Sequence, residues 1–321
     1  MLEFNRPFPV DSGCGHVLMF EREVGFARVR LACGCSRAQA ATAMFSERLR
    51  ITKHEECAPS WYKIAFHAPH IAAEAVPGQF FMVRVGAGTD PFLRRPMSLH
   101  RLVRDGDGGI VGFELLYKVV GRGTGLLSEV RVGEYLEVLG PLGRGFRIEE
   151  GAHLHYVVMG GTGVAPMPAF VEVLLGAGIK PIVLYGARTG VQLVCKQDFE
   201  LEGVALTLFT DDGSLGTKGM VTGRLEELLS SAVSEKRGGS GVALYACGPH
   251  AMLTTVGQVA QRLGIPCQVS LESRMGCGFG ACMSCAVRAA EPGPNGESRY
   301  IRVCLEGPVV DSRRVLWEIA S

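Results

Sequence analysis

The spacing of hydrophobic and polar residues divides the chain into stretches with different periodicity. Between residues 49 and 150, hydrophobic and polar residues alternate in short runs bounded by Gly, Pro or Asp, which is typical of half-buried antiparallel strands joined by tight turns. Strands at this regular spacing, with little helix between them, predict a small antiparallel β-barrel. The predicted strands are Tyr62–His67, Gln79–Val85, Met97–Arg104, Gly112–Val119 and Glu134–Leu139.

From residue 151 to 264 the pattern changes to β-branched runs that alternate with stretches of helical spacing. Strands that alternate with helices predict a doubly wound parallel sheet, whose ligands bind in the crevice at the carboxyl ends of the strands. Strands are expected at His155–Met159, Pro181–Tyr185, Ala205–Phe209 and Ala243–Ala246. Helices are expected at Met167–Leu175, near Cys195–Leu201, at Val221–Leu229 and at His250–Leu263.

The two ends of the chain have weaker patterns. Residues 1–48 form an extension of unknown role, with a helical-looking stretch at Arg37–Arg48 and with Cys14, Cys33 and Cys35 at no consistent metal-ligand spacing. Residues 265–321 hold short strands and a glycine-rich loop. We therefore expect an extension, a barrel, an α/β domain and a small C-terminal domain.

Composition and charge exclude several classes of protein. The 33 Lys and Arg residues balance 32 Asp and Glu residues, and no basic stripe is interleaved with aromatics, so nucleic-acid binding is not expected. The longest hydrophobic runs, such as Val242–Cys247, are too short to span a bilayer, so no membrane association is expected. An odd number of cysteines, 11, and the lack of a secretory leader predict a reduced, cytoplasmic protein rather than a disulfide framework.

The most specific motif lies in the C-terminal loop. Cys277, Cys282 and Cys285 have the spacing Cys-x4-Cys-x2-Cys, and Cys304 follows, which is the plant-type pattern for a [2Fe–2S] cluster. Small residues between these cysteines let the loop wrap closely around such a cluster. Structural zinc is the alternative, but zinc sites usually consist of two Cys-x2-Cys pairs, and here the second half offers only one cysteine. The spacing favours iron–sulfur.

Glycine-rich turns follow two of the strands predicted in the α/β domain. Gly160-Gly161-Thr162-Gly163 lies between a strand and a helix, and Cys247-Gly248-Pro249 ends a later strand. At such turns the backbone can approach a pyrophosphate closely, with helix N-terminal amides facing the anion. The full Gly-x-Gly-x-x-Gly motif is absent, so an ordinary strand–helix turn is the alternative. Two such turns at one sheet edge favour a dinucleotide site.

Asp211 and Asp212 follow the third strand of the same domain. A carboxylate at this place accepts hydrogen bonds from a ribose and repels a 2′-phosphate, which favours NAD over NADP. The alternative is a plain surface turn, because Asp-Asp-Gly is a good turn sequence.

Two segments of the predicted barrel carry groups that suit phosphates. In Arg94-Arg95-Pro96-Met97-Ser98, an arginine fork and a serine hydroxyl can reach a diphosphate or a flavin edge. A second glycine-rich turn with a hydroxyl group, Gly121-Arg-Gly123-Thr124, suits phosphate binding by backbone amides.

These motifs together resemble the ferredoxin–NADP reductase superfamily, in which Arg95-Pro96-x-Ser98, Gly123-Thr124, Gly161-x-Gly163 and Cys247-Gly248-Pro249 occur in the same order. More closely, the chain resembles electron-transfer subunits of class 1B dihydroorotate dehydrogenase over residues 49 to 312. The segments that carry this second resemblance are Asp90-Pro-Phe-Leu-Arg-Arg-Pro, Val138-Leu-Gly-Pro-Leu-Gly, Asp212-Gly-Ser-x-Gly-x-Lys-Gly and Ser270-Leu-Glu-x-Arg-Met-x-Cys-Gly-x-Gly-Ala-Cys. The last of these is the most specific.

The resemblance implies that FAD binds in the barrel, NAD in the α/β domain and a [2Fe–2S] cluster in the C-terminal part. Electrons would pass between NAD and the FMN of a separate dihydroorotate dehydrogenase catalytic subunit, in pyrimidine (UMP) biosynthesis and in a heterotetramer. A flavin is the expected converter, because a hydride carries an electron pair and a cluster takes one electron at a time. By position, the flavin would contact Arg95, Pro96, Ser98, Gly123 and Thr124, NAD would contact Gly161, Thr162 and Gly163, and Cys247 would lie near the nicotinamide.

The chain departs from the superfamily pattern at two positions. Met97 stands where many members have an aromatic residue against the flavin, and Thr162 stands where an aliphatic residue is frequent. Glu272 and Arg274, beside the cysteine loop, are candidates for contact with the partner subunit. Two alternatives are a reductase component for another partner, of NAD(P)H:ferredoxin or sulfide type, and a non-catalytic iron–sulfur or zinc scaffold.

Overall fold

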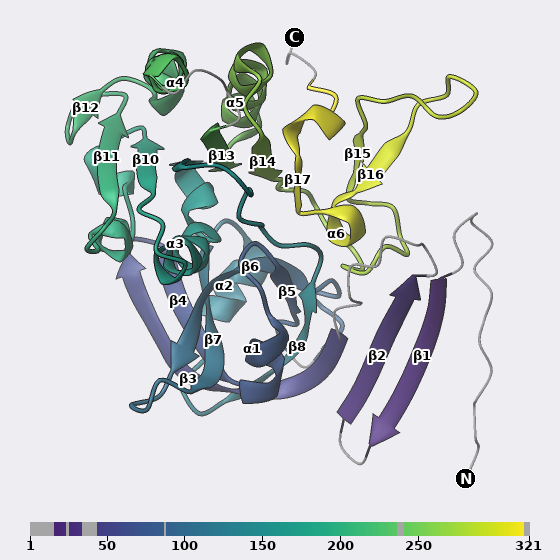
Figure 1. Cartoon of the computed structure of the whole chain (residues 1–321). Coiled ribbons are helices and arrows are strands. Elements are labelled where there is room, and N and C mark those ends of the chain that lie inside the picture. Colours follow the sequence, from purple (N-terminus) through teal and green to yellow (C-terminus); the bar gives the residue numbers. More distant parts are fainter. Residues whose placement is uncertain (1–15, 24–25, 34–43, 87, 236–240, 318–321) are drawn as a thin grey trace.

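A computed structural model describes residues 16–23, 26–33, 44–86, 88–235 and 241–317 of the chain. It shows a barrel, a mixed sheet with helices on both faces, and a C-terminal region that contacts both (Figure 1).

The barrel consists of six antiparallel strands. A pairing between its first and last strands closes it, as the alternating pattern predicted. Its strands, in spatial order, are β3 (Met44–Ala58), β4 (Trp61–His67), β7 (Ile110–Lys118), β6 (Arg95–Arg104), β5 (Phe80–Val83) and β8 (Tyr135–Leu142). Its interior is filled by aliphatic and aromatic side chains, among them Phe81 and Phe113, whose ring centroids are 4.0 Å apart. Two short helices accompany the barrel, α1 (Pro69–Glu74) and α2 (Arg122–Ser128).

A hairpin of β1 (His16–Glu23) and β2 (Phe26–Cys33) extends the barrel sheet, because β2 pairs with the start of β3. The helix expected at Arg37–Arg48 is wrong from Met44 onward, where the chain is already in β3. Phe45 and Leu49 are buried on the barrel side of this strand, so pairing with both β4 and β8 outweighs local helix preference. Residues 34–43, Cys14 and Cys35 lie outside the described residues.

The α/β part contains seven strands, and only the last of them runs antiparallel to its neighbour. In spatial order they are β12 (Thr217–Lys218), β11 (Ala205–Thr210), β10 (Ile182–Ala187), β9 (Leu154–Gly160), β13 (Val242–Cys247), β14 (Cys267–Ser270) and β17 (Val309–Asp311). The predicted doubly wound parallel sheet is confirmed, with β17 added at one edge.

Helices cover both faces of this sheet because its central strands are hydrophobic on both sides. Val157 and Met159 of β9 pack with α3 (Met167–Gly176), whereas Tyr156 and Val158 face the core of α4 (Leu225–Glu235) and α5 (His250–Leu263). The helices expected near Cys195–Leu201 and at Val221–Leu229 are shorter or interrupted. Residues Lys196–Phe199 form a 3₁₀ turn, and another 3₁₀ turn at Val221–Gly223 precedes α4.

The C-terminal region is joined to both other parts. It contains a hairpin of β15 (Ala286–Arg288) and β16 (Tyr300–Arg302), helix α6 (Val303–Glu306) and a 3₁₀ turn at Ser312–Arg314. The strands that flank it, β14 and β17, belong to the α/β sheet. Its buried residues share one hydrophobic cluster with Met82 and Leu142 of the barrel.

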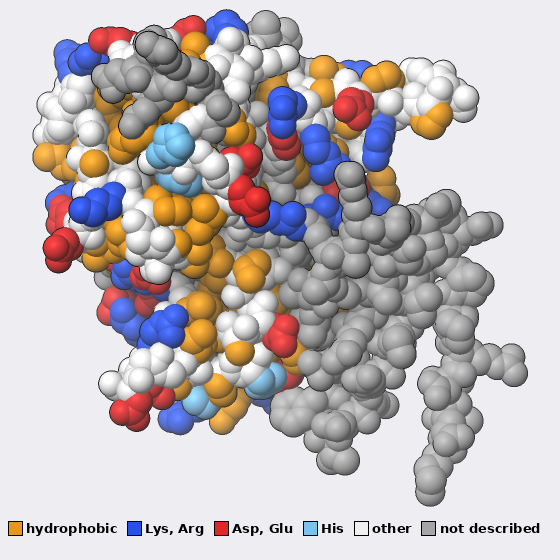
Figure 2. Space-filling view, viewed as in Figure 1, with side chains coloured by type: hydrophobic (Ala, Val, Ile, Leu, Met, Phe, Trp, Pro, Cys, Tyr) orange, Lys and Arg blue, Asp and Glu red, His pale blue; other side chains and the backbone are white. Residues whose placement is uncertain are grey.

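No helix among the described residues is long and hydrophobic enough to cross a membrane. On the face shown in Figure 2, the basic side chains are interspersed with acidic ones, which fits the near-zero net charge.

Candidate functional site

The four C-terminal cysteines lie in two pairs. The amide of Cys277 donates to Sγ of Cys282 at 3.4 Å, and the amide of Cys304 donates to Sγ of Cys285 at 3.4 Å. The first pair is at the surface, with Cys282 exposed, and the second pair is buried.

This arrangement bears on the choice between zinc and iron–sulfur. Four thiolates on one zinc ion, at about 2.3 Å each, would all lie about 3.8 Å from one another. Within the described part of the chain, the only three potential ligands whose atoms all lie within 4.8 Å of one another are His100, Cys195 and Asp198. No three of the four C-terminal thiols meet that limit, so they do not form a tetrahedral zinc site. Two pairs suit a cluster of two irons, each with two thiolates.

Backbone and side-chain donors surround the outer sulfurs. The Ser284 hydroxyl lies 3.1 Å from Sγ of Cys282 and accepts from the amide of Gly276 at 2.9 Å, and the amide of Ala281 donates to Sγ of Cys277 at 3.3 Å. Hydrogen bonding from Ser284, and then from Cys277, lowers the pKa of the Cys282 thiol to about 6. The thiolate is the form that binds iron, so this end of the loop is prepared for metal.

The tip of the cysteine loop packs on the barrel. Gly278 has φ +85°, and a Cβ there would lie 2.5 Å from Cγ of Met82 in β5 and 3.2 Å from Leu142 in β8. Only glycine satisfies both the backbone conformation and this close approach. Met82 pairs with Pro96 of β6, so the loop lies one strand away from the segment predicted to bind flavin.

In that segment, Arg95 is held against the glycine-rich turn at the start of α2. A Cβ on Gly123 would lie 2.3 Å from Nε of Arg95, and Nη1 of Arg95 donates to the carbonyl oxygen of Leu93 at 2.6 Å. The structure therefore brings Arg95 and Gly123, two of the residues expected to contact the flavin, next to each other. They form a basic cradle that an added methyl group would fill.

The hydroxyl of Thr124 has a local role. It accepts from the amides of Val120 and Gly121 and donates to the carbonyl oxygen of Gly121 at 3.0 Å, which fixes the turn before α2. A phosphate contact from Thr124 would therefore come from its backbone amide.

The outward face of β6 is turned toward the α/β part. Met97 and Leu99 point into the barrel core, so Pro96, Ser98 and His100 alternate onto the other face. His100 Nδ1 lies 2.8 Å from the carbonyl oxygen of Ala165, just before α3. Ser98 thus borders the space between the two parts, whereas Met97, buried in the barrel, offers no exposed surface for stacking on a flavin.

The two glycine-rich turns of the α/β part meet at the carboxyl edge of the sheet. A Cβ on Gly163 would lie 2.0 Å from the carbonyl oxygen of Cys247, so the turn after β9 packs on the end of β13. Gly160 and Gly248 both lie against the side chain of Met252 in α5. Gly161 has φ +55°, and residues Gly161–Val164 form a 3₁₀ turn before α3. Both turns occupy the crevice where such sheets bind ligands.

Two side chains link this edge to the cysteine loop. Thr162 donates from Oγ1 to Oε1 of Glu272 at 2.9 Å, and Glu272 stands two residues after the end of β14. Burial, and then the charge of Glu272, raise the pKa of the Cys247 thiol. Cys247 is therefore a neutral thiol at pH 7, suited to contact with a ring rather than to nucleophilic attack.

Asp211 directly follows β11, two strands away from the glycine-rich turn at the end of β9, and its amide donates to the carbonyl oxygen of Ala187 at 3.1 Å. Asp212 accepts from the amide and the hydroxyl of Ser214, which lowers the pKa of this exposed carboxyl group. The exposed Asp211 lies at the sheet edge as predicted, and the hydrogen bonds of Asp212 to Ser214 make it part of a surface turn.

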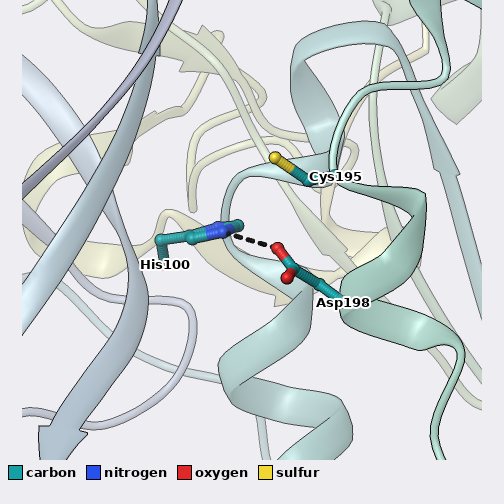
Figure 3. A group of neighbouring side chains, drawn as sticks. All are labelled: His100, Cys195 and Asp198. Carbon is teal, nitrogen blue, oxygen red and sulfur yellow. Dashed lines mark hydrogen bonds and ion pairs between the residues drawn. The ribbon is translucent and has the colours of Figure 1, made fainter. Parts of the chain in front are cut away.

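The sequence did not reveal a buried polar cluster where the barrel meets the α/β part. The carboxylate of Asp198, 6% exposed, lies 2.8 Å from Nζ of Lys63, 3.1 Å from Nε2 of His100 and 3.2 Å from Nη1 of Arg101. Figure 3 shows the His100 ring directed at this carboxylate, with Cys195 on the adjoining turn. We call Lys63, His100, Arg101 and Asp198 the interdomain cluster. Each residue is ordinary in its local sequence, so no spacing signal identifies the group.

A closed barrel beside a doubly wound sheet, with a cysteine loop at their junction, defines a reductase of the ferredoxin–NADP reductase fold that carries an iron–sulfur domain. The chain is similar in structure to an NADH-dependent reduced ferredoxin–NADP oxidoreductase, with a TM-score of 0.65 and 28% identity over 84% of this chain and 90% of that one. It shares the fold of phthalate dioxygenase reductase, with a TM-score of 0.54 and 17% identity over 84% and 95% of the two chains.

Comparison with protein families is more specific. Residues 272–316 match the iron–sulfur cluster binding domain of dihydroorotate dehydrogenase B, and residues 157–258 match the oxidoreductase NAD-binding domain. The electron-transfer subunit of NAD-dependent dihydroorotate dehydrogenase B from Desulforamulus reducens is 40% identical over 261 residues, 81% of this chain and 94% of the relative. The corresponding subunit from a Geobacillus species is 36% identical over 275 residues, 85% and 99% of the two chains.

The chain therefore belongs to the family of electron-transfer subunits of NAD-dependent dihydroorotate dehydrogenase B. It is an oxidoreductase subunit with an NAD-binding domain and an iron–sulfur domain.

Proposed function

We propose that this chain carries FAD and a [2Fe–2S] cluster and moves electrons between NAD and an FMN-containing dihydroorotate dehydrogenase catalytic subunit, in a heterotetramer with two copies of each subunit. In pyrimidine biosynthesis the net flow runs from dihydroorotate to NAD. The family to which the chain belongs supports the assignment to this enzyme, and the geometry of the chain supports the cofactors.

The observation that carries the proposal is the position of the cysteine loop. Gly278 lies against Met82, and Met82 pairs with Pro96 in the strand that holds Arg95 and Ser98. Neighbouring strands are about 5 Å apart. A cluster in the loop, next to β5, and a flavin next to β6 would therefore be close enough for direct electron transfer.

The residues around β6 fit a flavin. Arg95, held over Gly123, offers a guanidinium to a diphosphate, and Ser98 borders the space between the barrel and the α/β part. When bound, a flavin exchanges hydrides with a nicotinamide and single electrons with a cluster. The chain's own contribution is to hold the diphosphate by charge and to place Ser98 beside the cofactor.

The cysteine loop fits a two-iron cluster. Cys277 and Cys282 would hold the iron nearer to the surface, and Cys285 and Cys304 the buried one. The exposed end of this loop, with Phe279 and Met283 at the surface, supports contact with a partner subunit there. A cluster between flavin and partner would be the point at which electrons from the partner enter this chain.

The crevice at the sheet edge fits NAD. Gly161 and Gly163 let the backbone approach a pyrophosphate, and Cys247 and Glu272 lie at the same edge for the nicotinamide end. Asp211 supports a preference for NAD, because a carboxylate repels a 2′-phosphate.

The test is the visible absorption spectrum of the anaerobically purified chain, with iron, sulfide and flavin analysis, before and after NADH. We expect flavin bands and broad iron–sulfur absorbance that both bleach, with about two irons per chain. The variant Cys304→Ser should lose the iron–sulfur absorbance, whereas the matched variant Cys267→Ser, at a buried cysteine outside the loop, should keep it. A colourless protein, or one with stoichiometric zinc, would contradict the proposal.

The partner is tested by co-purification with an FMN-containing dihydroorotate dehydrogenase subunit. We expect a stable complex that couples dihydroorotate oxidation to NAD reduction. Reduction of ferredoxin by NADH at a high rate, without such a complex, would favour a reductase component for another partner.

A further inference from the structure

A pair of thiols lies beside the interdomain cluster and bridges the barrel and the α/β part. Cys57, near the end of β3, and Cys195, at the turn after β10, are 138 positions apart in sequence, and their sulfurs are 3.9 Å apart. Both cysteines are free thiols, and neither belongs to the cysteine loop. Nothing in electron transfer between NAD, flavin and cluster requires them.

From this geometry we infer that Cys57 and Cys195 form a site of reversible oxidation, at which hydrogen peroxide generates a disulfide between the barrel and the α/β part. A disulfide requires an S–S distance of about 2.05 Å, so the two sulfurs must approach each other by roughly 2 Å. Rotation about side-chain bonds together with a small movement of the 195–199 turn can supply this approach.

The two cysteines differ in solvent exposure, and this difference assigns them different roles in the oxidation. Cys57 is half-buried, so a small oxidant can reach it, whereas Cys195 is only 4% exposed. Cys195 also has φ 55°, a left-handed conformation that is uncommon for a residue with a side chain. This conformation is maintained by its neighbours, since the amide of Asp198 donates to the carbonyl oxygen of Cys195 at 2.9 Å. Cys57 is therefore the attacking thiol and Cys195 the resolving one.

Electrostatics agrees with this assignment. The hydrogen bond from Cys195, and then the charge of Lys63, lower the pKa of the Cys57 thiol to about 7, although burial opposes the shift. The same hydrogen bond and burial raise the pKa of Cys195. Burial likewise raises the pKa of Cys247 and of Cys267. Of Cys57, Cys195, Cys247 and Cys267, Cys57 is thus the one with a substantial thiolate fraction at neutral pH.

The chemistry balances with peroxide as the only oxidant. The Cys57 thiolate attacks one peroxide oxygen, the O–O bond breaks, and hydroxide leaves as the sulfenic acid forms. The Cys195 sulfur then attacks the sulfenic sulfur, the S–O bond breaks, and the hydroxyl group departs as water with the Cys195 proton. Two thiols lose two electrons and two protons, and peroxide becomes two waters.

A metal ion is the competing occupant, because His100, Cys195 and Asp198 offer ligand atoms within 4.8 Å of one another. The carboxylate of Asp198 already accepts from Lys63 and Arg101 as well as facing His100. An ammonium group 2.8 Å from the same oxygen opposes a divalent cation there. The two sulfurs of Cys57 and Cys195, by contrast, face each other directly, so disulfide formation does not require a cation to leave first.

The experiment treats the complete, cofactor-loaded protein with low multiples of hydrogen peroxide, blocks the remaining thiols with an alkylating reagent and maps peptides by mass spectrometry. We expect a Cys57–Cys195 linked peptide that forms while the cluster absorbance is retained, and that dithiothreitol reverses. In Cys195→Ser, a sulfenic-acid probe should label Cys57 instead. The matched variant Cys267→Ser should behave as the wild type.

A second measurement does not depend on any variant. In the untreated wild type, Cys57 should react with iodoacetamide at pH 7 at least about tenfold faster than Cys267. Loss of the cluster before any Cys57–Cys195 link appears, or equal reactivity of Cys57 and Cys267, would overturn the inference. Stoichiometric zinc in the wild type that Cys195→Ser abolishes would assign His100, Cys195 and Asp198 to a metal ion instead.

Discussion

Replacing Asp198 by Asn tests whether the interdomain cluster holds the barrel and the α/β part together by charge. The substitution keeps the shape of the side chain and removes the one carboxylate that faces Lys63, His100 and Arg101. Because this carboxylate is buried, water cannot replace it as a partner for Lys63, His100 and Arg101. We expect a substantial loss of stability.

The size of the loss follows from the partners that remain. Removing one member of a buried ion pair costs about 3–5 kcal/mol. Lys63 keeps Glu114 at 3.9 Å, and Arg101 keeps Glu172 at 2.8 Å, so both of these charged side chains retain a carboxylate. We therefore expect the lower end of the range, about 3 kcal/mol, or a fall in thermal midpoint of about 6–12 °C.

The effect depends on pH in a definite direction. Burial by itself raises the pKa of Asp198, but hydrogen bonds from His100 and Lys63 and the charge of Arg101 reverse this and lower the pKa well below its ordinary value. A lowered pKa gives stability that is fully present above the unfolded-state pKa, about 4, and is lost as the pH falls toward the folded-state pKa. The difference between wild type and D198N should be constant from pH 5 to 8 and shrink below about pH 4.

The assay is denaturation followed by tryptophan fluorescence. Trp61, 7% exposed, packs in the same hydrophobic cluster as Phe170 of α3 and so reports on the junction. The matched control is Asp107→Asn, an exposed carboxylate in a barrel turn, which should change stability by less than about 0.5 kcal/mol. If D198N were as stable as this control, the cluster would contribute no net electrostatic stability, and the argument would be refuted.

Three further substitutions test the cofactor sites. Gly123→Ala places a Cβ 2.3 Å from Nε of Arg95, so we expect flavin affinity to fall at least about tenfold, as measured by flavin retained on purification. Undiminished flavin content would contradict this placement of the diphosphate. Gly163→Ala forces a Cβ to within 2.0 Å of the backbone at the end of β13, so the KM for NADH should rise while flavin and cluster absorbance persist. An unchanged KM would remove this turn from the nucleotide site. Ser284→Ala removes the hydroxyl 3.1 Å from Sγ of Cys282, so the cluster potential should become more negative in an EPR-monitored redox titration, and an unchanged potential would exclude this hydrogen bond as a determinant.

The sequence predicted those elements whose hydrophobic pattern is set by one face of a sheet. Strands such as β4 and β7 could be recognised as short runs rich in hydrophobic residues and bounded by turn residues, and β9 and β13 are hydrophobic on both faces as central parallel strands are. Strand β3 was missed because its outward positions are mostly charged and only a few residues, such as Phe45 and Ile51, mark its buried face. Such a strand is defined by its pairing with β4 and β8, which local sequence does not show.

The candidate sites divide along the same line. The four C-terminal cysteines could be predicted because their spacing along the chain encodes the ligand set. The contact of Gly278 with Met82, which places the loop next to the barrel, joins residues far apart in sequence and leaves no local signal. The interdomain cluster is even less predictable from the sequence, since Lys63, His100 and Asp198 come from β4, β6 and the 196–199 turn. Its charges meet only when the two parts have folded against each other.

One short segment connects all three cofactor regions. Leaving β14 at the sheet edge, the chain first places Glu272 against Thr162 of the nucleotide turn, and within a few residues it reaches Cys277 and then Gly278 against the barrel. A shift of Glu272 is therefore passed along a few covalent bonds to the cysteine loop. Because Thr162 lies in the turn predicted to contact the pyrophosphate, the same hydrogen bond that closes the nucleotide turn also positions the start of the loop. This shared segment explains why the iron–sulfur domain is part of the edge of the nucleotide-binding sheet. A cluster domain attached by a flexible linker would leave the distance between cluster and flavin unfixed.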